Sequence, residues 1–363
     1  MKAANTCNRI VIFLFGGSFP GLSLLGFAVS ILSVISVQGH VKDTSRYVLV
    51  IHRGAGAITN ASMTPEKERL YRAGLDSALQ AGYRILEQGG TALDAVETSI
   101  KIMEDDSLFN AGRGAVFTNA GRNELDASIM DGATLAAGAV AGVTTIKNPI
   151  SAARAVMERS PHVMMAGQGA EQFAAASGCE GVDQRWFFTH DKWMSLQKLK
   201  LADSIKLLER QKGGKSRSQW RGTNDEKYGT VGAVALDMHG NLAAATSTGG
   251  MTNKRFGRIG DSPVIGAGTY ADNNTCAVSC TGWGEYFIRL VMAKTVADRM
   301  ELAKETLDDA ATEMIMKRLP ALGGDGGLIA VDKVGNHVMV FNTAGMYRAI
   351  KKSDGTTGIY LYK

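Results

Sequence analysis

The chain has 363 residues, of which 45% are hydrophobic and 21% are charged, so it can bury a large core and is neither disordered nor fibrous. Its 40 basic and 35 acidic residues leave a formal charge of +5. Two segments carry the excess: residues 1–39 hold two basic and no acidic residues, and residues 198–228 hold nine basic and four acidic ones. Because the basic charge is local, the composition does not support a nucleic-acid surface.

The N-terminal segment has the pattern of a secretory signal sequence. Residues 10–39 contain no charged residue and follow Lys2 and Arg9, and small residues precede a possible cleavage site before His40. The run is also long enough to span a bilayer. Interruption by glycine and proline favours cleavage, so the sequence predicts a signal sequence over 1–39 and an exported protein, periplasmic or secreted. A membrane anchor formed by residues 10–39 is the alternative.

Hydrophobic periodicity predicts a mixture of helices and strands. A buried strand over 47–51 runs into His52-Arg53-Gly54-Ala55-Gly56, and Thr64-Pro65 begins a helix that ends at Gly89-Gly90. Thr91 and Asp94 form a capping pattern for a second helix that reaches about Glu104. Further helices are expected at 149–159, 168–177, 285–297 and 303–318, and strands at 136–144, 231–237, 241–247, 275–280, 327–332 and 336–342. Short turns between paired strands indicate antiparallel hairpins, hence α+β or layered α/β architecture.

A threonine at a chain junction suggests a nucleophile. Residues from about 198 to 229 become polar and glycine-rich and are predicted to be a flexible linker, and Thr230 then begins an apolar strand. A threonine hydroxyl needs a base, and an α-amino group with a pKa near 8 is one. A cut between Gly229 and Thr230 would give Thr230 both groups. Alone, a threonine at a strand start is usually only a β-former, so the surrounding motifs must show whether Thr230 is a nucleophile.

Seven segments carry a resemblance to a known family. In chain order they are FNAGRGAVF (109–117), ELDASIMDG (124–132), AGAVAGV (137–143), GTVGAVALD (229–237), STGGMTNK (247–254), GRIGDSP (257–263) and SCTGWGE (279–285). Together they resemble the plant-type, or class 2, L-asparaginases, which are also isoaspartyl peptidases of the N-terminal nucleophile hydrolase superfamily. The resemblance runs from about 48 to 361. It implies an α+β fold, a four-layer αββα sandwich, in which 40–229 and 230–363 are the α and β subunits of one domain.

The resemblance also implies roles for individual residues. Thr230 would be the nucleophile, freed by a cut after Gly229, with Thr248 hydrogen-bonded to it. The other residues implied by the family motifs are Asn110, which positions the nucleophile region; Thr281 and Gly282, which form an oxyanion hole; and Arg258, Asp261, Thr281, Gly282 and Gly284, which bind the substrate. A planar arginine fork suits an α-carboxylate and a compact aspartate suits an α-ammonium. Without the resemblance, these would be ordinary turns, hydroxyls and a surface ion pair.

Cofactor and assembly expectations rest on the same resemblance. No organic cofactor is expected, while segment 105–113 resembles the family's sodium-binding loop, in which backbone carbonyls hold the ion. The mature enzyme would be a heterotetramer of two α and two β subunits that acts on small molecules. Two positions depart from the family: Arg53 replaces a glycine of a mobile loop and is expected to slow self-cleavage, and Trp283 replaces a smaller residue beside the substrate loop.

The sequence therefore predicts a threonine amidohydrolase that cleaves L-asparagine and β-aspartyl dipeptides through a Thr230 acyl-enzyme. One alternative is a glycosylasparaginase-like amidase that acts on Asn-linked sugars. The other is an uncleaved amino-acid-binding pseudoenzyme in which Arg53 has disabled maturation.

Overall fold

The computed structural model describes residues 46–59, 63–211 and 229–363. Residues 44–363 form one compact unit. The predicted signal sequence and the second half of the predicted linker lie outside the described residues. Among the residues that are described, no helix combines the length and apolar character needed to cross a bilayer.

Twelve described strands form two sheets. The order in the larger sheet is β12-β11-β1-β5-β6-β2-β3-β4, and in the smaller one β10-β9-β8-β7. Neighbouring strands pair antiparallel except β3 and β4, which are parallel. The strands are β1 (Val48–Gly56), β2 (Leu125–Asp131), β3 (Ala137–Val143), β4 (Met164–Ala166), β5 (Val231–Leu236), β6 (Leu242–Thr248), β7 (Thr269–Ala271), β8 (Cys276–Gly282), β9 (Gly326–Asp332), β10 (His337–Phe341), β11 (Gly345–Lys352) and β12 (Thr357–Tyr362).

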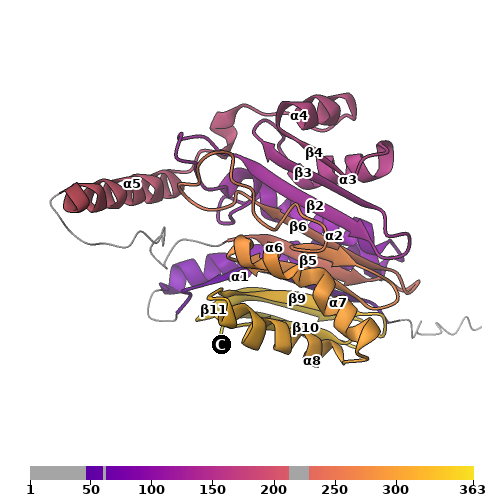
Figure 1. Ribbon diagram of the computed structural model, residues 1–363. Coiled ribbons are helices and arrows are strands. Elements are labelled where there is room, and N and C mark those ends of the chain that lie inside the picture. The colour runs from indigo at the N-terminus through magenta and orange to yellow at the C-terminus, as the bar shows by residue number, and fades with distance from the viewer. Residues whose placement is uncertain (1–45, 60–62, 212–228) are drawn as a thin grey trace, which may run out of the picture. The chain divides into compact units, whose positions relative to one another are not determined.

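Helices cover the outer face of each sheet (Figure 1). The first group packs on the larger sheet: α1 (Pro65–Glu87), α2 (Ala92–Asp105), α3 (Pro149–Arg159) and α4 (Gly167–Ala176). The second group packs on the smaller sheet: α6 (Gly284–Leu290), α7 (Met292–Leu302), α8 (Leu307–Thr312), the π-helical turn η4 (Glu313–Arg318) and α9 (Leu319–Ala321). Helix α5 (His190–Gln211) and the short 3₁₀ turns η2 (Gly112–Gly114) and η3 (Gln184–Phe187) complete the described elements.

Side chains that point alternately to the two faces of each strand form the two hydrophobic cores. In β1, Leu49 and Ile51 contribute to the core beneath α1, α2 and α3. Val48 and Val50 point the other way and join the core between the two sheets, because successive strand side chains face opposite sides. The layers are therefore helix, sheet, sheet, helix, and the predicted αββα sandwich is confirmed.

Local sequence signals placed the first two helices correctly. Thr64 accepts a hydrogen bond from Lys67 N at 3.2 Å and Pro65 is the first helical residue, while Thr91 accepts from Asp94 N at 3.1 Å. Both are N-caps that satisfy donors the helix leaves free. The hairpins β5–β6 and β9–β10 also form as predicted.

Three sequence predictions need correction. The linker was placed from 198, but α5 continues to Gln211, in keeping with a stretch rich in leucine and lysine, both good helix formers. The single helix expected over 285–297 is broken at Val291, which has a φ of 45°. Strands β2, β4, β7, β11 and β12 were not predicted as strands.

Arg53 has an ordinary backbone conformation, contrary to the strain expected there. It lies within β1, and the positive φ of 110° falls on the next residue, Gly54. The guanidinium of Arg53 donates to the Leu108 carbonyl. Its carbon lies 4.0 Å from the ring centroid of Tyr71 and 4.7 Å from that of Tyr347. The charge is therefore held in an aromatic cage, and Arg53 joins β1 to α1, β11 and the loop after α2.

We expect Arg53→Met to lower the free energy of unfolding by about 2 kcal/mol, because it keeps the apolar stem but removes the cation and its hydrogen bond. Chemical denaturation followed by circular dichroism measures the change. The control is Arg113→Met, which removes an exposed arginine 5.1 Å from a single ring, that of Trp186. Equal losses in both variants would contradict a structural role for the cage.

Candidate active site

Strand pairing brings Thr230 and Thr248 face to face. Strand β5 pairs antiparallel with β6, and Val231 lies opposite Ser247, so Thr230 stands opposite Thr248. The Thr230 hydroxyl donates to Thr248 Oγ1 at 3.3 Å, and both residues are buried. Thr248 Oγ1 also accepts from Gly250 N at 2.9 Å. The predicted nucleophile and its predicted partner are thus adjacent.

A small pocket opens beside these threonines. It is lined by Gly229, Thr230, Thr248, Gly250, Met251, Arg258, Gly260, Asp261, Ser262 and Gly282. Six of the predicted site residues are in this lining: both residues of the predicted cut, Thr248, the two charged residues and Gly282. Segments far apart in the sequence therefore meet where the resemblance requires them to meet.

The end of β8 supplies a buried hydroxyl that has no hydrogen-bond partner among the described residues. Thr281 is 1% exposed, and its Oγ1 makes no hydrogen bond within the part of the chain that the structure describes. Gly282, which follows it, has a φ of 155°, and a Cβ there would lie 2.5 Å from the carbonyl oxygen of Asp325. A buried hydroxyl without a partner is costly, so this position is suited to a ligand that accepts its proton.

Arg258 and Asp261 lie together but are not paired in the expected way. The Nε and Nη2 atoms of Arg258 donate to the Glu285 carboxylate at 3.0 and 2.9 Å. Asp261 is buried, and its Oδ2 has no hydrogen-bond partner among the described residues. Burial raises the pKa of Asp261 to about 7, and the charge of Arg258 opposes this rise. An ammonium group in the pocket would favour the ionised carboxylate.

Two glycines keep space around this pair of charges. A Cβ on Gly284 would lie 2.7 Å from Asp261 Oδ1 and 3.0 Å from Arg258 Nη2, and one on Gly260 would lie 2.9 Å from Arg258 Nη1. Side chains at these positions would therefore displace the charged groups. Gly284 was predicted to bind substrate; in the structure, its lack of a side chain allows the close approach.

Asn110 connects the junction to the turn after β6. Its Nδ2 donates to the Gly250 carbonyl at 2.8 Å, and its Oδ1 accepts from Val116 N at 2.9 Å. Its own carbonyl accepts from Gly249 N at 3.1 Å. A Cβ on Gly229 would be 2.9 Å from the Cβ of Asn110. Asn110 therefore contacts the predicted cleavage site directly and also holds the turn that follows Thr248.

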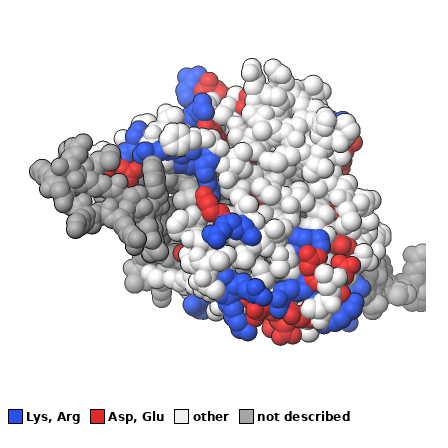
Figure 2. Space-filling view, viewed as in Figure 1, with Lys and Arg blue, Asp and Glu red and all other residues white. Residues whose placement is uncertain are grey.

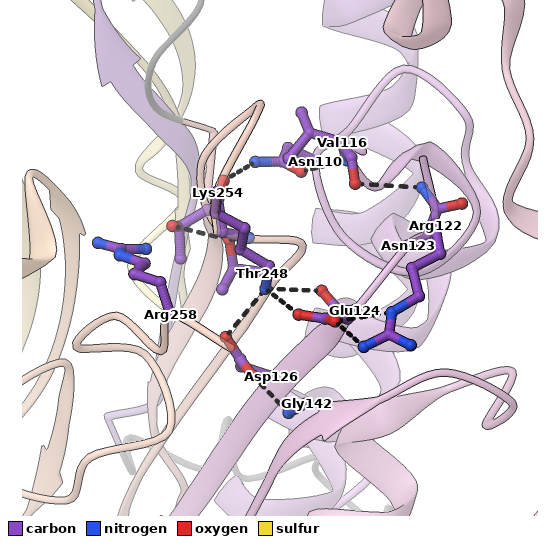
Figure 3. Close-up of polar contacts among 12 residues, drawn as sticks. Asn110, Val116, Arg122, Asn123, Glu124, Asp126, Gly142, Thr248, Lys254 and Arg258 are labelled. Carbon is purple, nitrogen blue, oxygen red and sulfur yellow. Dashed lines mark hydrogen bonds and ion pairs between the residues drawn. The ribbon is translucent and has the colours of Figure 1, made fainter. Parts of the chain in front are cut away.

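A buried ion cluster beneath the pocket was not predicted from the sequence. Lys254 Nζ donates to the Glu124 carbonyl at 3.1 Å and lies 3.8 and 4.0 Å from the carboxylates of Glu124 and Asp126 (Figure 3). Asp126 pairs with Thr248 across strands. Burial lowers the pKa of Lys254 and raises that of Asp126, and each partner's charge opposes the effect on the other. The sequence signal that could have indicated this cluster is Lys254, the one charged residue of the motif STGGMTNK (247–254).

His52 is the second functional candidate that sequence reasoning missed. It is 0% exposed, and its Nε2 lies 3.1 Å from Ser279 Oγ. Its Nδ1 accepts from Gly54 N at 3.3 Å, which leaves the proton on Nε2. Burial lowers the pKa of His52 to about 3, although a hydrogen bond with the Thr230 main chain acts in the opposite direction. The ring is therefore neutral at physiological pH.

This depressed pKa predicts a specific acid sensitivity. The folded state resists protonation of His52 down to about pH 3, whereas the unfolded chain takes up the proton near 6.5. Stability from this group is present above pH 6.5 and is lost as the pH falls toward 3, at up to about 1.4 kcal/mol per pH unit.

We expect His52→Gln to flatten the dependence of unfolding free energy on pH over this range, measured by urea denaturation at a series of pH values. His162→Gln, which changes an exposed histidine, is the control and keeps the original slope. An unchanged slope in His52→Gln would show that His52 is protonated in the folded protein.

Comparisons with known proteins identify the family of the chain. The family described as Asparaginase matches residues 45–361. An isoaspartyl peptidase of Escherichia coli is 51% identical over 87% of this chain and 97% of its own length. An isoaspartyl peptidase/L-asparaginase of Rattus norvegicus is 43% identical over 86% of this chain and 89% of its own length. A probable isoaspartyl peptidase/L-asparaginase 2 of Arabidopsis thaliana is 42% identical over 87% and 99%.

These relatives contradict the predicted export of the protein. The E. coli protein and a similar one from Salmonella typhimurium are covered over 97% and 99% of their own length, which leaves them no counterpart of residues 1–39. The prediction of an exported or membrane-anchored protein is therefore wrong by this comparison. The match to the family spans nearly all of the folded unit. The chain is a hydrolase that belongs to the family of plant-type asparaginases and isoaspartyl peptidases.

Proposed function

We propose that this protein is an autoprocessed threonine amidohydrolase that cleaves L-asparagine and β-aspartyl dipeptides. The observation that carries the proposal is the 3.3 Å contact between the hydroxyls of Thr230 and Thr248, in a pocket that also holds Arg258 and Asp261. The relatives from E. coli and R. norvegicus bear the names of these activities. Both substrates share a free aspartyl head with one carboxylate and one ammonium group.

The reaction would use the two groups of an N-terminal threonine. Once Thr230 begins a chain, its α-amine takes the proton of its own hydroxyl, and Oγ1 attacks the β-carbonyl of the substrate. The negative oxygen that develops would be held by the Thr281 hydroxyl and the Gly282 N–H. Collapse expels ammonia or an amino acid, which receives the proton, and leaves an ester on Thr230. Water then hydrolyses the ester and releases aspartate.

The substrate head would be held by the two charged residues of the pocket. Arg258 Nη1 lies between Gly250 and Gly260, since Cβ atoms there would be 3.6 and 2.9 Å from it, and Glu285 holds the opposite side of the fork. An α-carboxylate would accept from the pocket side of this guanidinium. Asp261 Oδ2, which has no hydrogen-bond partner within the described ranges, would accept from the α-ammonium.

Close packing at the junction supports self-cleavage. A Cβ on Gly54 would lie only 2.8 Å from the Cα of Gly229, so the backbone of β1 at this glycine packs closely against the bond that must be cut. In the cut, Thr230 Oγ1 attacks the Gly229 carbonyl, an ester replaces the peptide bond, and water hydrolyses that ester. The product would have a free amine on Thr230 and a free carboxylate on Gly229. Two copies of each fragment would then form the heterotetramer.

A sodium ion on segment 105–113 stays a proposal. Gly112 has a φ of 49°, and a Cβ there would lie 2.3 Å from the Glu104 carbonyl, so the loop wraps the last turn of α2. Helix-end carbonyls are suitable ligands for a hard cation, and the described residues offer no cluster of acidic, histidine and cysteine side chains as an alternative site. The ion would fix the loop that carries Asn110 and take no part in the reaction.

Two alternatives are separated from this proposal by simple experiments. Release of aspartate from asparagine and β-aspartyl dipeptides, but not from glycosylasparagine, distinguishes the proposal from a glycosylasparaginase-like amidase. A denaturing gel that shows two fragments excludes an uncleaved amino-acid-binding protein. On the face shown in Figure 2, basic side chains are interspersed with acidic ones.

For the nucleophile, we expect the purified protein to yield a fragment that begins at Thr230. Thr230→Ala stays one chain and loses activity, because no hydroxyl remains, whereas Thr230→Ser keeps part of both functions. Gel electrophoresis, N-terminal sequencing and aspartate release measure these outcomes. Thr275→Ala, which changes a buried threonine outside the pocket, is the control. A fragment that begins elsewhere would rule out Thr230 as the nucleophile.

For the substrate head, we expect Arg258→Lys to raise KM for asparagine about tenfold or more, because a single ammonium cannot serve both Glu285 and the substrate carboxylate. The effect on kcat should be smaller, since the group binds substrate before and during the reaction alike. Arg255→Lys, in the same loop and paired with Asp203 at 3.2 Å, is the matched control. Initial rates decide: equal KM values in both variants would assign Arg258 a structural role only.

A further inference from the structure

A row of buried polar side chains crosses the space between the two sheets. We call His52, Ser128, Thr246, Thr269 and Ser279 the hydroxyl row. All five are 0% exposed, in a layer that is otherwise packed with valine, alanine and leucine. Buried hydroxyls weaken a core unless they are hydrogen-bonded, so a continuous set of them calls for an explanation.

The members of the row are linked from end to end. His52 Nε2 lies 3.1 Å from Ser279 Oγ, and Ser279 Oγ lies 2.7 Å from Thr246 Oγ1. Thr269 donates to Thr246 Oγ1 at 2.6 Å, and Ser128 lies 2.8 Å from Thr269 Oγ1. Each strand supplies one member: β1, β2 and β6 from the larger sheet, and β7 and β8 from the smaller one. The row therefore joins the two sheets through directional bonds.

Strand register places this row one step beneath the candidate catalytic threonines. Thr248 follows Thr246 by two residues in β6, and Thr281 follows Ser279 by two residues in β8. Residues two apart in a strand share a face. Thr230 stands in the same relation to Gly232, which pairs with His52 and with Thr246. Thr246 thus lies directly below Thr248, and Ser279 lies directly below Thr281. Below Thr230 lies Gly232, which is next to the His52 ring.

Gly232 makes the crossing possible. A Cβ on this residue would lie 2.1 Å from both His52 Nε2 and Ser279 Oγ, so any side chain would occupy the space where the two sheets are joined. The imidazole therefore reaches across β5 directly below Thr230. At the other end of the row, Ser128 lies 2.6 Å from the Ser262 carbonyl, next to the residue that would bind the substrate ammonium.

We propose that the hydroxyl row is a positioning device that sets the distance and register between Thr281 on the smaller sheet and Thr230 and Thr248 on the larger one. The inference rests on the proposed function. Apolar side chains between sheets resist separation but oppose sliding weakly, because hydrophobic contact has no direction. Hydrogen bonds are directional, so they oppose sliding of the two sheets. Without the row, the oxyanion donor could shift relative to the nucleophile, and a misplacement of about 1 Å can lower a rate about 100-fold.

Thr246 is the residue to test, because it bonds both Ser279 and Thr269. Thr246→Val keeps the shape and removes the hydroxyl, and we expect kcat for asparagine to fall about 100-fold while KM changes less than about threefold. Thr246→Ser restores the hydroxyl and should recover most of kcat. Ser279→Ala cuts the row at a second point and should repeat the loss. Rates are taken per mature site, from the fraction of fragments on a gel.

Ser99→Ala is the matched control. Ser99 is also a 0% exposed hydroxyl, but it donates to the Ala78 carbonyl between α1 and α2, on the other side of the larger sheet. We expect its kcat to stay at the wild-type value although its melting temperature falls as in Thr246→Val. This comparison separates loss of a buried hydrogen bond from loss of position in the site.

The outcomes are distinguishable. Wild-type kcat in both Thr246→Val and Ser279→Ala, with Thr230→Ala inactive, would overturn the positioning role alone. So would a kcat of Thr246→Ser no higher than that of Thr246→Val, or an equal loss in Ser99→Ala. A wild-type protein that releases no aspartate from any substrate would overturn the proposed function and this inference with it.

Discussion

The register of β5 against β6 is the constraint on which the candidate site depends. A shift by one residue would turn every side chain of a strand to the opposite face and send Thr248 into the helix layer. Both faces of β6 oppose such a shift. On the helix side, Ser247 donates to Glu104 Oε1 at 2.6 Å, and the same oxygen accepts from Ile150 N at 3.1 Å, at the start of α3. On the sheet side, Thr246 is held by the hydroxyl row.

Glycine at the places of closest approach is the second requirement, and it accounts for part of the unusual composition of 43 glycines. Gly54, Gly229 and Gly232 each lie where a Cβ would meet another residue at 2.9 Å or less. Because these residues lack a Cβ, the backbone of β1 at Gly54, the Gly229–Thr230 bond and the His52 ring can pack closely against their neighbours. Close packing at the site thus depends on the absence of side chains at these glycines as well as on the side chains that are present.

The sequence predicted the layered fold, because long motifs identify the family and amphipathic periods identify helices. It missed β11 and β12, whose partners are β1 and each other and whose strand character comes from long-range pairing. It also missed His52 and Lys254, since their functional contacts join segments more than 120 residues apart in the chain. Such contacts leave no local pattern. At Arg53 the family pattern suggested strain, but the neighbouring glycine takes the unusual φ and an aromatic cage, invisible in the local sequence, holds the charge.

The electrostatics of the pocket support the proposed binding of an aspartyl head. Arg258 and Asp261 are both buried, yet they do not neutralise each other: the arginine is bonded to Glu285, and Asp261 Oδ2 has no partner among the described residues. Burial raises the pKa of Asp261 to about 7 although the charge of Arg258 opposes this rise, so a second cation beside the carboxylate would favour its ionised form. A ligand ammonium would give Asp261 a charged partner, and a carboxylate beside it would accept from Arg258 Nη1 while Nε and Nη2 stay bonded to Glu285. Under the proposed function, selectivity for a free α-amino acid head would thus rest on two buried charges in one small volume, of which Arg258 already has a carboxylate partner in Glu285 and Asp261 Oδ2 has none among the described residues.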